Sequence, residues 1–76
     1  MQRDLNLKLP IVYTLPTCRA SDTLKADWAK AGIKFEERLV SERQDWLDEA
    51  LNYGDMVPII VYPEGRVEIG YKNLIG

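Results

Sequence analysis

The residue in this chain best suited to covalent chemistry is its single cysteine, Cys18. It follows the apolar run Ile11-Val12 and Pro16, at the point where a buried strand ends and a helix is expected to begin. At the start of a helix, unpaired backbone N–H groups and the positive end of the helix dipole stabilise a thiolate. Arg19 adds a positive charge beside it. The thiolate is the attacking form in disulfide exchange, so this placement predicts a reactive thiol, with an inert buried cysteine as the alternative.

Ser21 stands three residues after Cys18, about one helical turn away. Its hydroxyl is in a position to donate a hydrogen bond to the thiolate, and the alternative is an ordinary serine of the first turn. A serine cannot form a disulfide, so any mixed disulfide on Cys18 has to be released by a thiol from outside the chain. The predicted catalytic residues are therefore Cys18, Arg19 and Ser21.

Length and composition exclude several classes of protein. The 76 residues predict one domain, 1–76, in which residues 1–9 form an N-terminal lead-in. The net charge of −2 argues against a nucleic-acid module, and no apolar run approaches 18 residues, so no membrane span is expected. One cysteine and no histidine argue against an internal disulfide and against a metal site built from this chain alone. We expect a cytoplasmic monomer.

Hydrophobic periodicity and turn residues predict an α/β fold in the order β-α-β-α-β-β. The expected elements are strands at 10–14, 33–40, 58–62 and 66–69, and helices at 17–31 and 42–51. A helix joins the first two strands, which should be parallel, and a tight turn joins the last two, which must be antiparallel. The result is a mixed four-stranded sheet packed by helices.

Capping residues predict where the helices begin and end. Thr17 is the expected N-cap of the first helix, and Ser41 with Gln44 forms a capping-box pattern for the second. Gly32 is expected to end the first helix with a positive φ. In the second helix Trp46, Leu47, Ala50 and Leu51 form the expected apolar face. In the turn "PEG" (63–65), proline suits the second position and glycine a left-handed one.

Val57-Pro58 opens the third strand, at the level of the cysteine loop. It is a candidate cis peptide bond, but only about 5–6% of X–Pro bonds in folded proteins are cis. The residues alone therefore favour trans.

Four segments in this order resemble the glutaredoxins, small members of the thioredoxin-like superfamily. "VYTLPTCRAS" is similar to their active-site segment, "AGIKFEER" to the start of their second strand, and "MVPIIVY" to their Val-Pro strand. "RVEIGY" is similar to the last strand and its glycine turn. The resemblance covers about residues 10 to 73 and implies a thioredoxin-like, glutaredoxin-type fold.

The resemblance implies roles for particular residues. Cys18 would be the nucleophile, Pro58 would be cis, and the Val57 backbone would pair with the peptide part of glutathione or of a protein thiol substrate. The glutathione-binding residues implied are Tyr13, Val57, Pro58, Gly70, Tyr71 and Lys72. With Ser21 at the second cysteine position, the chain resembles a monothiol member with glutathione as co-substrate.

The chain departs from the family pattern at several positions. Leu15 stands where many members have a lysine for the glutathione carboxylate, and Gly70-Tyr71 replaces a double glycine. Lys72 would supply positive charge there, and the alternative is an ordinary surface lysine. The Cys-Gly-Phe-Ser signature of cluster-binding members is absent, because residues 19 and 20 are Arg and Ala, so no iron–sulfur cluster is expected. The family's last helix is expected to be truncated.

Three hypotheses for function follow. The first is a glutaredoxin-like thiol–disulfide oxidoreductase that exchanges glutathione on Cys18, with a glutathione-ligated iron–sulfur carrier as a variant. The second is a non-catalytic thioredoxin-fold module that binds a partner through the groove beside Val57-Pro58. The third, ranked last, is a likeness to the N-terminal domain of glutathione transferases, whose acidic-Ser pair is replaced here by Gly70-Tyr71.

Overall fold

The computed structural model describes residues 9–72 and confirms the predicted β-α-β-α-β-β order. The elements are β1 (Ile11–Thr14), α1 (Arg19–Ala31), β2 (Glu36–Leu39), α2 (Gln44–Leu51), β3 (Ile59–Val61) and β4 (Val67–Ile69). The predicted lead-in, except Leu9, and the expected truncated last helix lie outside the described residues.

The four strands form one mixed sheet in the order β2-β1-β3-β4. β1 runs parallel to β2, with Tyr13 opposite Arg38, and antiparallel to β3, with Tyr13 opposite Ile59. β3 and β4 are antiparallel, with Ile60 opposite Glu68. The parallel first pair and the antiparallel last pair were both predicted from the connections between the strands.

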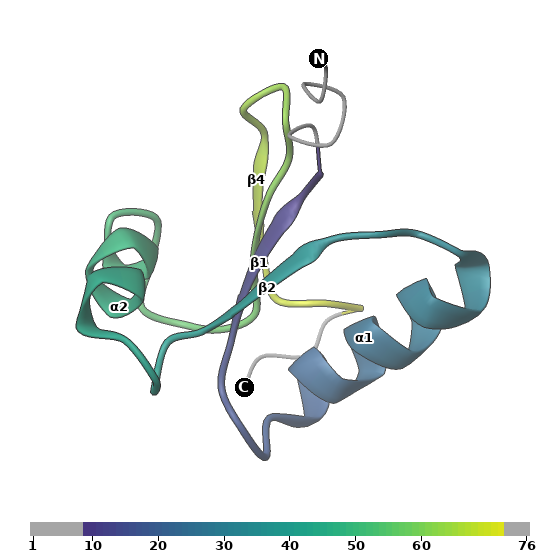
Figure 1. Ribbon diagram of the computed structural model, residues 1–76, viewed down its shortest axis with the longest axis horizontal. Coiled ribbons are helices and arrows are strands. Elements are labelled where there is room, and N and C mark those ends of the chain that lie inside the picture. Colours follow the sequence, from purple (N-terminus) through teal and green to yellow (C-terminus); the bar gives the residue numbers. More distant parts are fainter. Residues whose placement is uncertain (1–8, 73–76) are drawn as a thin grey trace.

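Alternation along β1 gives the sheet two different faces. Figure 1 shows the strands between α1 and α2, which lie on opposite sides of the sheet. Val12 packs with Leu24 and Trp28 of α1, whereas the next residue, Tyr13, packs with Ala50 of α2. Successive side chains of a strand point to opposite faces, so a single strand supplies both halves of the core.

The α1 face has an apolar core. Val12 and Leu24 are fully buried beside Ile60, and Trp28 meets Phe35 edge to face with ring centroids 5.4 Å apart. Burying one such aliphatic side chain contributes about 1.5–3 kcal/mol. This core fixes α1 against the sheet, and with it the position of the residues at the start of the helix.

The start of α1 differs from the prediction by one residue. Cys18, not Thr17, is the N-cap, with φ −93° and ψ 114°. Thr17 has a φ of 60°, and its hydroxyl donates to the carbonyl of Pro16. The assignment of Thr17 as N-cap was therefore wrong, because its backbone takes the left-handed turn that leads into the helix and its hydroxyl bonds backwards.

The capping box predicted for α2 is not formed. The helix begins at Gln44 with Arg43 as N-cap, and Arg43 makes no side-chain capping hydrogen bond. Ser41 and Glu42 lie in a turn in which the Glu42 N–H donates to the carbonyl of Leu39 at 3.0 Å. That turn takes Ser41 out of reach of the helix. Leu51, predicted on the apolar face, is 55% exposed because it lies at the last position of the helix.

Two glycine predictions are confirmed, and all four strands are shorter than expected, the second by the most. Gly32 ends α1 with a φ of 75°, and the Ile33 N–H donates to the carbonyl of Trp28 at 2.9 Å. Gly65 has a φ of 104°, and its N–H closes the turn onto the carbonyl of Tyr62 at 2.9 Å. The strand expected from residue 33 begins at Glu36, because Gly32 and Ile33 are used to end the helix.

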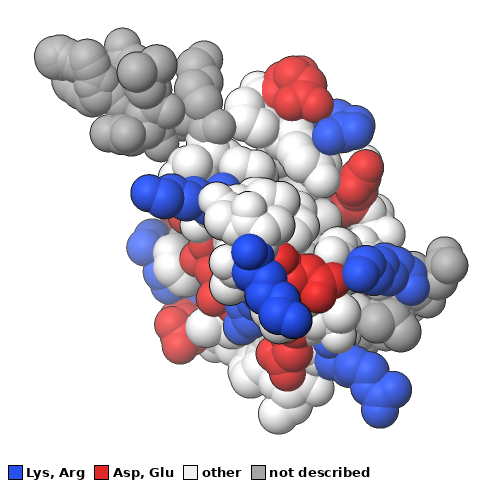
Figure 2. Space-filling view, turned by 90° about the vertical axis from the view of Figure 1, so that its right-hand side faces the viewer, with Lys and Arg blue, Asp and Glu red and all other residues white. Residues whose placement is uncertain are grey.

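Charges of both signs are intermixed on the face seen in Figure 2. Acidic and basic side chains alternate there with uncharged surface, and no continuous basic patch is visible on that face. Among the described residues, no helix has the length and apolar character needed to cross a membrane.

Candidate functional site

Cys18 lies at the N-terminus of α1, where the sequence predicted a thiolate-stabilising environment. Its Sγ accepts a hydrogen bond from the Ser21 N–H at 3.3 Å, and its carbonyl accepts from the Asp22 N–H at 2.9 Å. A sulfur that takes up one of the unpaired N–H groups of the first turn serves as the helix cap. The residue is 6% exposed, so the thiol is positioned by the helix and covered by its neighbours.

Ser21 contributes its backbone N–H, and not its hydroxyl, to Cys18. The Ser21 side chain is completely buried, and its Oγ has no hydrogen-bond partner among the described residues. The prediction that this hydroxyl donates to the sulfur is wrong, because the hydrogen bond to Cys18 Sγ comes from the backbone N–H and the Oγ makes none. A buried hydroxyl without a partner costs about 1–3 kcal/mol.

Arg19 is the first residue of α1, and its side chain is exposed. It makes no ion pair within the described part of the chain. Its positive charge is adjacent to Cys18 in the chain and is not neutralised by a described carboxylate.

The Val57–Pro58 peptide bond is cis, as the resemblance implied and the base rate did not. Val57 is 8% exposed and packs with Cys18 and Ala20 in one small cluster, which we call the Cys18 cluster. Neither the N–H nor the carbonyl of Val57 has a backbone partner among residues 9–72. Two residues distant in the sequence, Cys18 and Val57, are therefore brought together, and the Val57 backbone is left available for pairing.

Gly70 is held beside this cluster by the backbone. Its N–H donates to the carbonyl of Pro58 at 2.8 Å, and its φ of 87° turns the chain after β4. In Figure 1 the yellow segment after β4 leaves the sheet toward α1. The resemblance implied that this glycine approaches a ligand of Val57, and the structure places it one hydrogen bond away from Pro58.

Tyr71 and Lys72 both bind Asp27 of α1. The Tyr71 hydroxyl donates to Asp27 Oδ2 at 2.9 Å, and Lys72 Nζ lies 2.8 Å from the same oxygen. Hydrogen bonds from Lys72 and Tyr71 lower the pKa of Asp27, and Asp27 in turn raises the pKa of Lys72. Burial, and then the bond to Asp27, raise the pKa of Tyr71. The lysine expected to receive a substrate carboxylate is paired with a carboxylate of its own chain.

Tyr13, predicted among the ligand-binding residues, lies on the α2 face and is not part of the Cys18 cluster. It is 3% exposed, and its hydroxyl donates to Glu49 Oε1 at 2.9 Å. Burial, followed by the bond to Glu49, raises the pKa of Tyr13 to about 12. Its ring belongs to the core, and its one polar atom is used within the protein.

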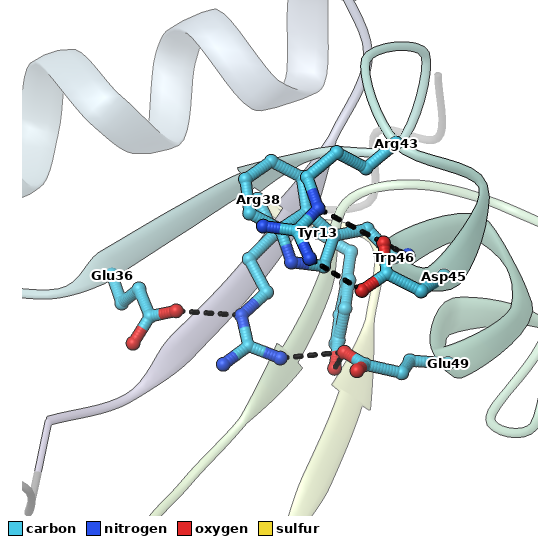
Figure 3. Close-up of polar contacts among 7 residues, drawn as sticks. All are labelled: Tyr13, Glu36, Arg38, Arg43, Asp45, Trp46 and Glu49. Atoms are coloured by element: carbon cyan, nitrogen blue, oxygen red, sulfur yellow. Dashed lines mark hydrogen bonds and ion pairs between the residues drawn. The ribbon is translucent and has the colours of Figure 1, made fainter.

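A polar network around Tyr13 was not found from the sequence. Figure 3 shows Arg38 of β2 between Glu36 and Glu49, with the Tyr13 hydroxyl at the same Glu49 carboxylate. Arg43 forms a two-bond ion pair with Asp45, with distances of 3.0 and 2.6 Å. The only available signal was the pair of glutamates followed by an arginine in "EERL" (36–39), which does not say that Glu49 lies opposite.

The α1 side of the sheet holds a second polar contact that the sequence did not reveal. Thr14 is fully buried, and its hydroxyl donates to Glu37 Oε2 at 2.7 Å, an oxygen that also accepts from Lys25 at 2.9 Å. Burial raises the pKa of Glu37, but the hydrogen bonds from Lys25 and Thr14 outweigh it and lower the pKa overall. This contact joins β1, β2 and α1 near the start of the cysteine loop.

No cluster of three or more Cys, Asp or Glu residues that could hold a metal ion is found in residues 9–72. The Cys18 cluster offers one helix-capping sulfur and one unpaired backbone, and the neighbouring Ser21 adds one hydroxyl without a described partner. A scan against protein-family models finds no match for the chain, and a search of curated proteins finds none.

Proposed function

We propose that the protein is a glutaredoxin-like thiol–disulfide oxidoreductase that works by a monothiol mechanism through Cys18. The observation that carries the proposal is the position of Cys18 Sγ, which caps α1 by accepting the Ser21 N–H. The same residue packs with Val57, whose backbone is unpaired in the described structure. A nucleophile and a backbone able to hold an extended substrate thus lie side by side.

The fold supports the same proposal. The order β2-β1-β3-β4, with one parallel and two antiparallel pairs and helices on both faces, agrees with a thioredoxin-like fold of glutaredoxin type. In an open α/β sheet, ligands bind beyond the carboxyl ends of the parallel strands. Cys18 follows the carboxyl end of β1, so it stands where a ligand is expected.

The proposed cycle has two exchange steps, with glutathione as co-substrate. The Cys18 thiolate attacks one sulfur of a disulfide, the S–S bond breaks, a Cys18–substrate disulfide forms, and the other sulfur leaves as a thiolate. A glutathione thiolate then attacks the mixed disulfide, regenerates the Cys18 thiolate and leaves bound to the substrate sulfur. Ser21 cannot replace that external thiol, and its N–H stabilises the thiolate in both steps.

The remaining residues have smaller parts in this proposal. Arg19 supplies unpaired positive charge next to the sulfur, and Val57, Pro58 and Gly70 line the path of an extended substrate. Tyr71 and Lys72 are held by Asp27 and form the end of this path after Gly70. Tyr13 supports β1 from the opposite face and makes no contact with substrate. We further propose a cytoplasmic, monomeric protein, since a single free thiol suits a reducing compartment.

Alkylation of Cys18 in the folded protein and in the chain unfolded in urea tests the proposal. We expect Cys18 of the folded protein to react with iodoacetamide at neutral pH, and oxidised glutathione to add one glutathione to the protein. Cys18→Ser is the control that removes both signals. A folded protein whose thiol neither reacts with iodoacetamide nor accepts glutathione, while the unfolded chain does both, would contradict an oxidoreductase.

The burial of Cys18 favours a second candidate function. At 6% exposed, the thiol resembles an inert core cysteine, and the protein would then be a non-catalytic module that binds a partner through the unpaired Val57 backbone. Ser21→Cys separates the two hypotheses, because a reactive Cys18 at the helix start would oxidise with it to an intramolecular disulfide. Failure to form that disulfide would favour the binding module.

A further inference from the structure

We infer that the disulfide taken by Cys18 belongs to a polypeptide with apolar side chains next to its cysteine, in preference to glutathione itself. This inference rests on the proposed function and concerns its substrate class. The evidence consists of the residues at the edge of the Cys18 cluster, the charges around it and the polar atoms that it leaves free.

The edge of the cluster is apolar on both sides. Leu15, three residues before Cys18, is 37% exposed, and Met56, directly before Val57, is 45% exposed. Three residues of chain span at most about 11 Å, and adjacent Cα atoms are about 3.8 Å apart, so both side chains start close to the cluster. A substrate in contact with Cys18 therefore meets a leucine and a methionine that are partly in water and gain from being covered.

The charges around the cluster do not suit an anionic tripeptide. Glutathione carries two carboxylates, and Lys72, which could bind one of them, is already 2.8 Å from Asp27. Asp55 precedes Met56 and adds negative charge near the Val57 backbone. The exposed Arg19 is one cation for two carboxylates. An uncharged, apolar segment needs no cation to pair with and is not affected by this shortage of positive charge.

The free polar atoms suit an extended backbone with a sulfur. Val57 offers an unpaired N–H and carbonyl, the groups that an added strand uses. The N–H of Ser21 donates to Cys18 Sγ, and its Oγ, three covalent bonds along the same residue, is fully buried without a partner in the described residues. This hydroxyl makes no hydrogen bond to Cys18 Sγ in the structure, so the Val57 backbone is the group available to an added strand.

The step is a simple exchange. The Cys18 thiolate attacks a sulfur of the substrate disulfide, a Cys18–peptide disulfide forms, and the second substrate sulfur leaves as a thiolate. An external low-molecular-weight thiol then reduces the mixed disulfide and takes the peptide sulfur into a new disulfide. Apolar contacts at Leu15 and Met56 act in the first step, because they hold the peptide that remains attached.

Three symmetric disulfides test the inference on the reduced full-length chain. They are oxidised glutathione, the disulfide of an uncharged pentapeptide with leucine on each side of its cysteine, and the same peptide with glutamate in place of leucine. Intact-mass spectrometry measures the rate at which each mixed disulfide forms. The rates for the chain unfolded in urea correct for the intrinsic reactivity of each disulfide.

After correction with the unfolded chain, we expect the mixed disulfide with the leucine peptide to form about tenfold faster than that with glutathione or with the glutamate peptide. This is the effect of partly burying one leucine side chain. Leu15→Lys should remove most of this preference and raise the rate with glutathione. Leu15→Gln should lower the rate of mixed-disulfide formation with the leucine peptide without raising the rate with oxidised glutathione. Leu9→Lys, at a residue equally exposed but before β1, should change neither.

Equal enhancement of the three disulfides, or a preference for glutathione, would overturn the inference and leave the proposed oxidoreductase in place. A folded protein that forms no adduct with any of the three, while the unfolded chain reacts, would overturn the proposed function and the inference together. The two failures are therefore distinguishable in one data set.

Discussion

Tyr13 and Ser21 both bury a hydroxyl, but the two regions that hold them treat it in opposite ways. On the α2 face, the Tyr13 hydroxyl donates to Glu49, and Arg38 donates to the same carboxylate. At the start of α1, the Ser21 hydroxyl has no described partner, although Cys18 Sγ lies at the N–H of the same residue. A satisfied buried network specifies structure, whereas a buried hydroxyl without a partner costs stability and does not hold the fold together.

This difference separates stability from chemistry in a chain of 76 residues. The predicted ligand residue Tyr13 belongs to the satisfied region, which explains why it serves the fold. The Cys18 cluster lies on the other region, where Val57 and Ser21 keep unpaired groups. The following variants test how far the two regions differ.

The largest expected effect comes from the core that both regions share. Leu24→Ala on the α1 face and Ile59→Ala on the α2 face should each lower the free energy of unfolding by about 2–5 kcal/mol, because both side chains are essentially fully buried. Urea unfolding followed by circular dichroism measures the change. Leu51→Ala, at an exposed position, is the control and should cost under about 1 kcal/mol. A cost at Leu24 as small as that at Leu51 would show that the α1 face is not the packed core described.

The Tyr13 network predicts a loss of stability at alkaline pH. The pKa of Tyr13 is about 12 in the folded protein and about 10 in an unfolded chain, so the unfolded chain loses this proton first. The contribution is complete below pH 10 and is lost as the pH rises toward 12, on the order of 2 kcal/mol in total. Tyr13→Phe should flatten the dependence of unfolding free energy on pH in this window, and Tyr53→Phe, at an exposed tyrosine, should not. Equal slopes for the wild-type chain and Tyr13→Phe would contradict the network.

The contacts of Glu37 on the α1 side of the sheet predict a smaller loss of stability, at acidic pH. Its pKa is lowered in the folded protein despite burial, because Lys25 and Thr14 bond its carboxylate. The contribution is present above an unfolded pKa of about 4.3 and is lost as the pH falls through the lower folded value, with a size of about 1 kcal/mol for a part-exposed pair.

Glu37→Gln should therefore reduce the slope of stability between pH 5 and pH 3. Glu42→Gln is the matched control, because Glu42 is exposed and makes no ion pair within the described residues. Acid unfolding monitored by tryptophan fluorescence gives the measurement. If both variants shift the slope alike, the effect is one of net charge and not of the Thr14 contact.

The smallest expected effect on stability comes from Ser21→Ala, which is compared directly with Thr14→Val. Ser21→Ala removes a buried hydroxyl that has no described partner, so stability should stay unchanged or rise by up to about 1 kcal/mol. Thr14→Val removes an equally buried hydroxyl that donates to Glu37 at 2.7 Å, and it should cost about 1–2 kcal/mol. A Ser21→Ala loss as large as that of Thr14→Val would mean that the Ser21 hydroxyl is satisfied in solution.

Local patterns predicted the order of the elements because those signals act over a few residues. Proline, glycine and hydrophobic spacing act locally, whatever the rest of the chain does. They predicted the strand at "PIVYT" (10–14), the end of α1 at Gly32 and the turn at Gly65. The errors at Thr17 and Ser41 have a common cause. Each residue is a good N-cap by type, but the chain around it folds into a turn that uses its backbone or hydroxyl elsewhere.

The candidate site was only partly visible from the sequence. The position of Cys18 at a strand-to-helix junction followed from local signals, whereas its packing against Val57 depends on a contact across 39 residues of chain, which no local pattern contains. The pairing of Lys72 with Asp27 is also a long-range contact, and it changes the meaning of a lysine that the resemblance had placed at a ligand. Glu49 and Arg38 likewise meet only when α2 lies on the sheet.

The sequence by itself determined the strand and helix order, the end of α1 and the place of the single thiol at a helix start, because each depends on backbone preferences within one or two turns of chain. The tertiary structure decided which buried polar atoms have partners. That outcome depends on which elements pack face to face, so it assigned Tyr13 and Lys72 to the protein's own contacts. It left the Ser21 hydroxyl and the Val57 backbone unpaired near Cys18 in the part of the chain that the structure describes.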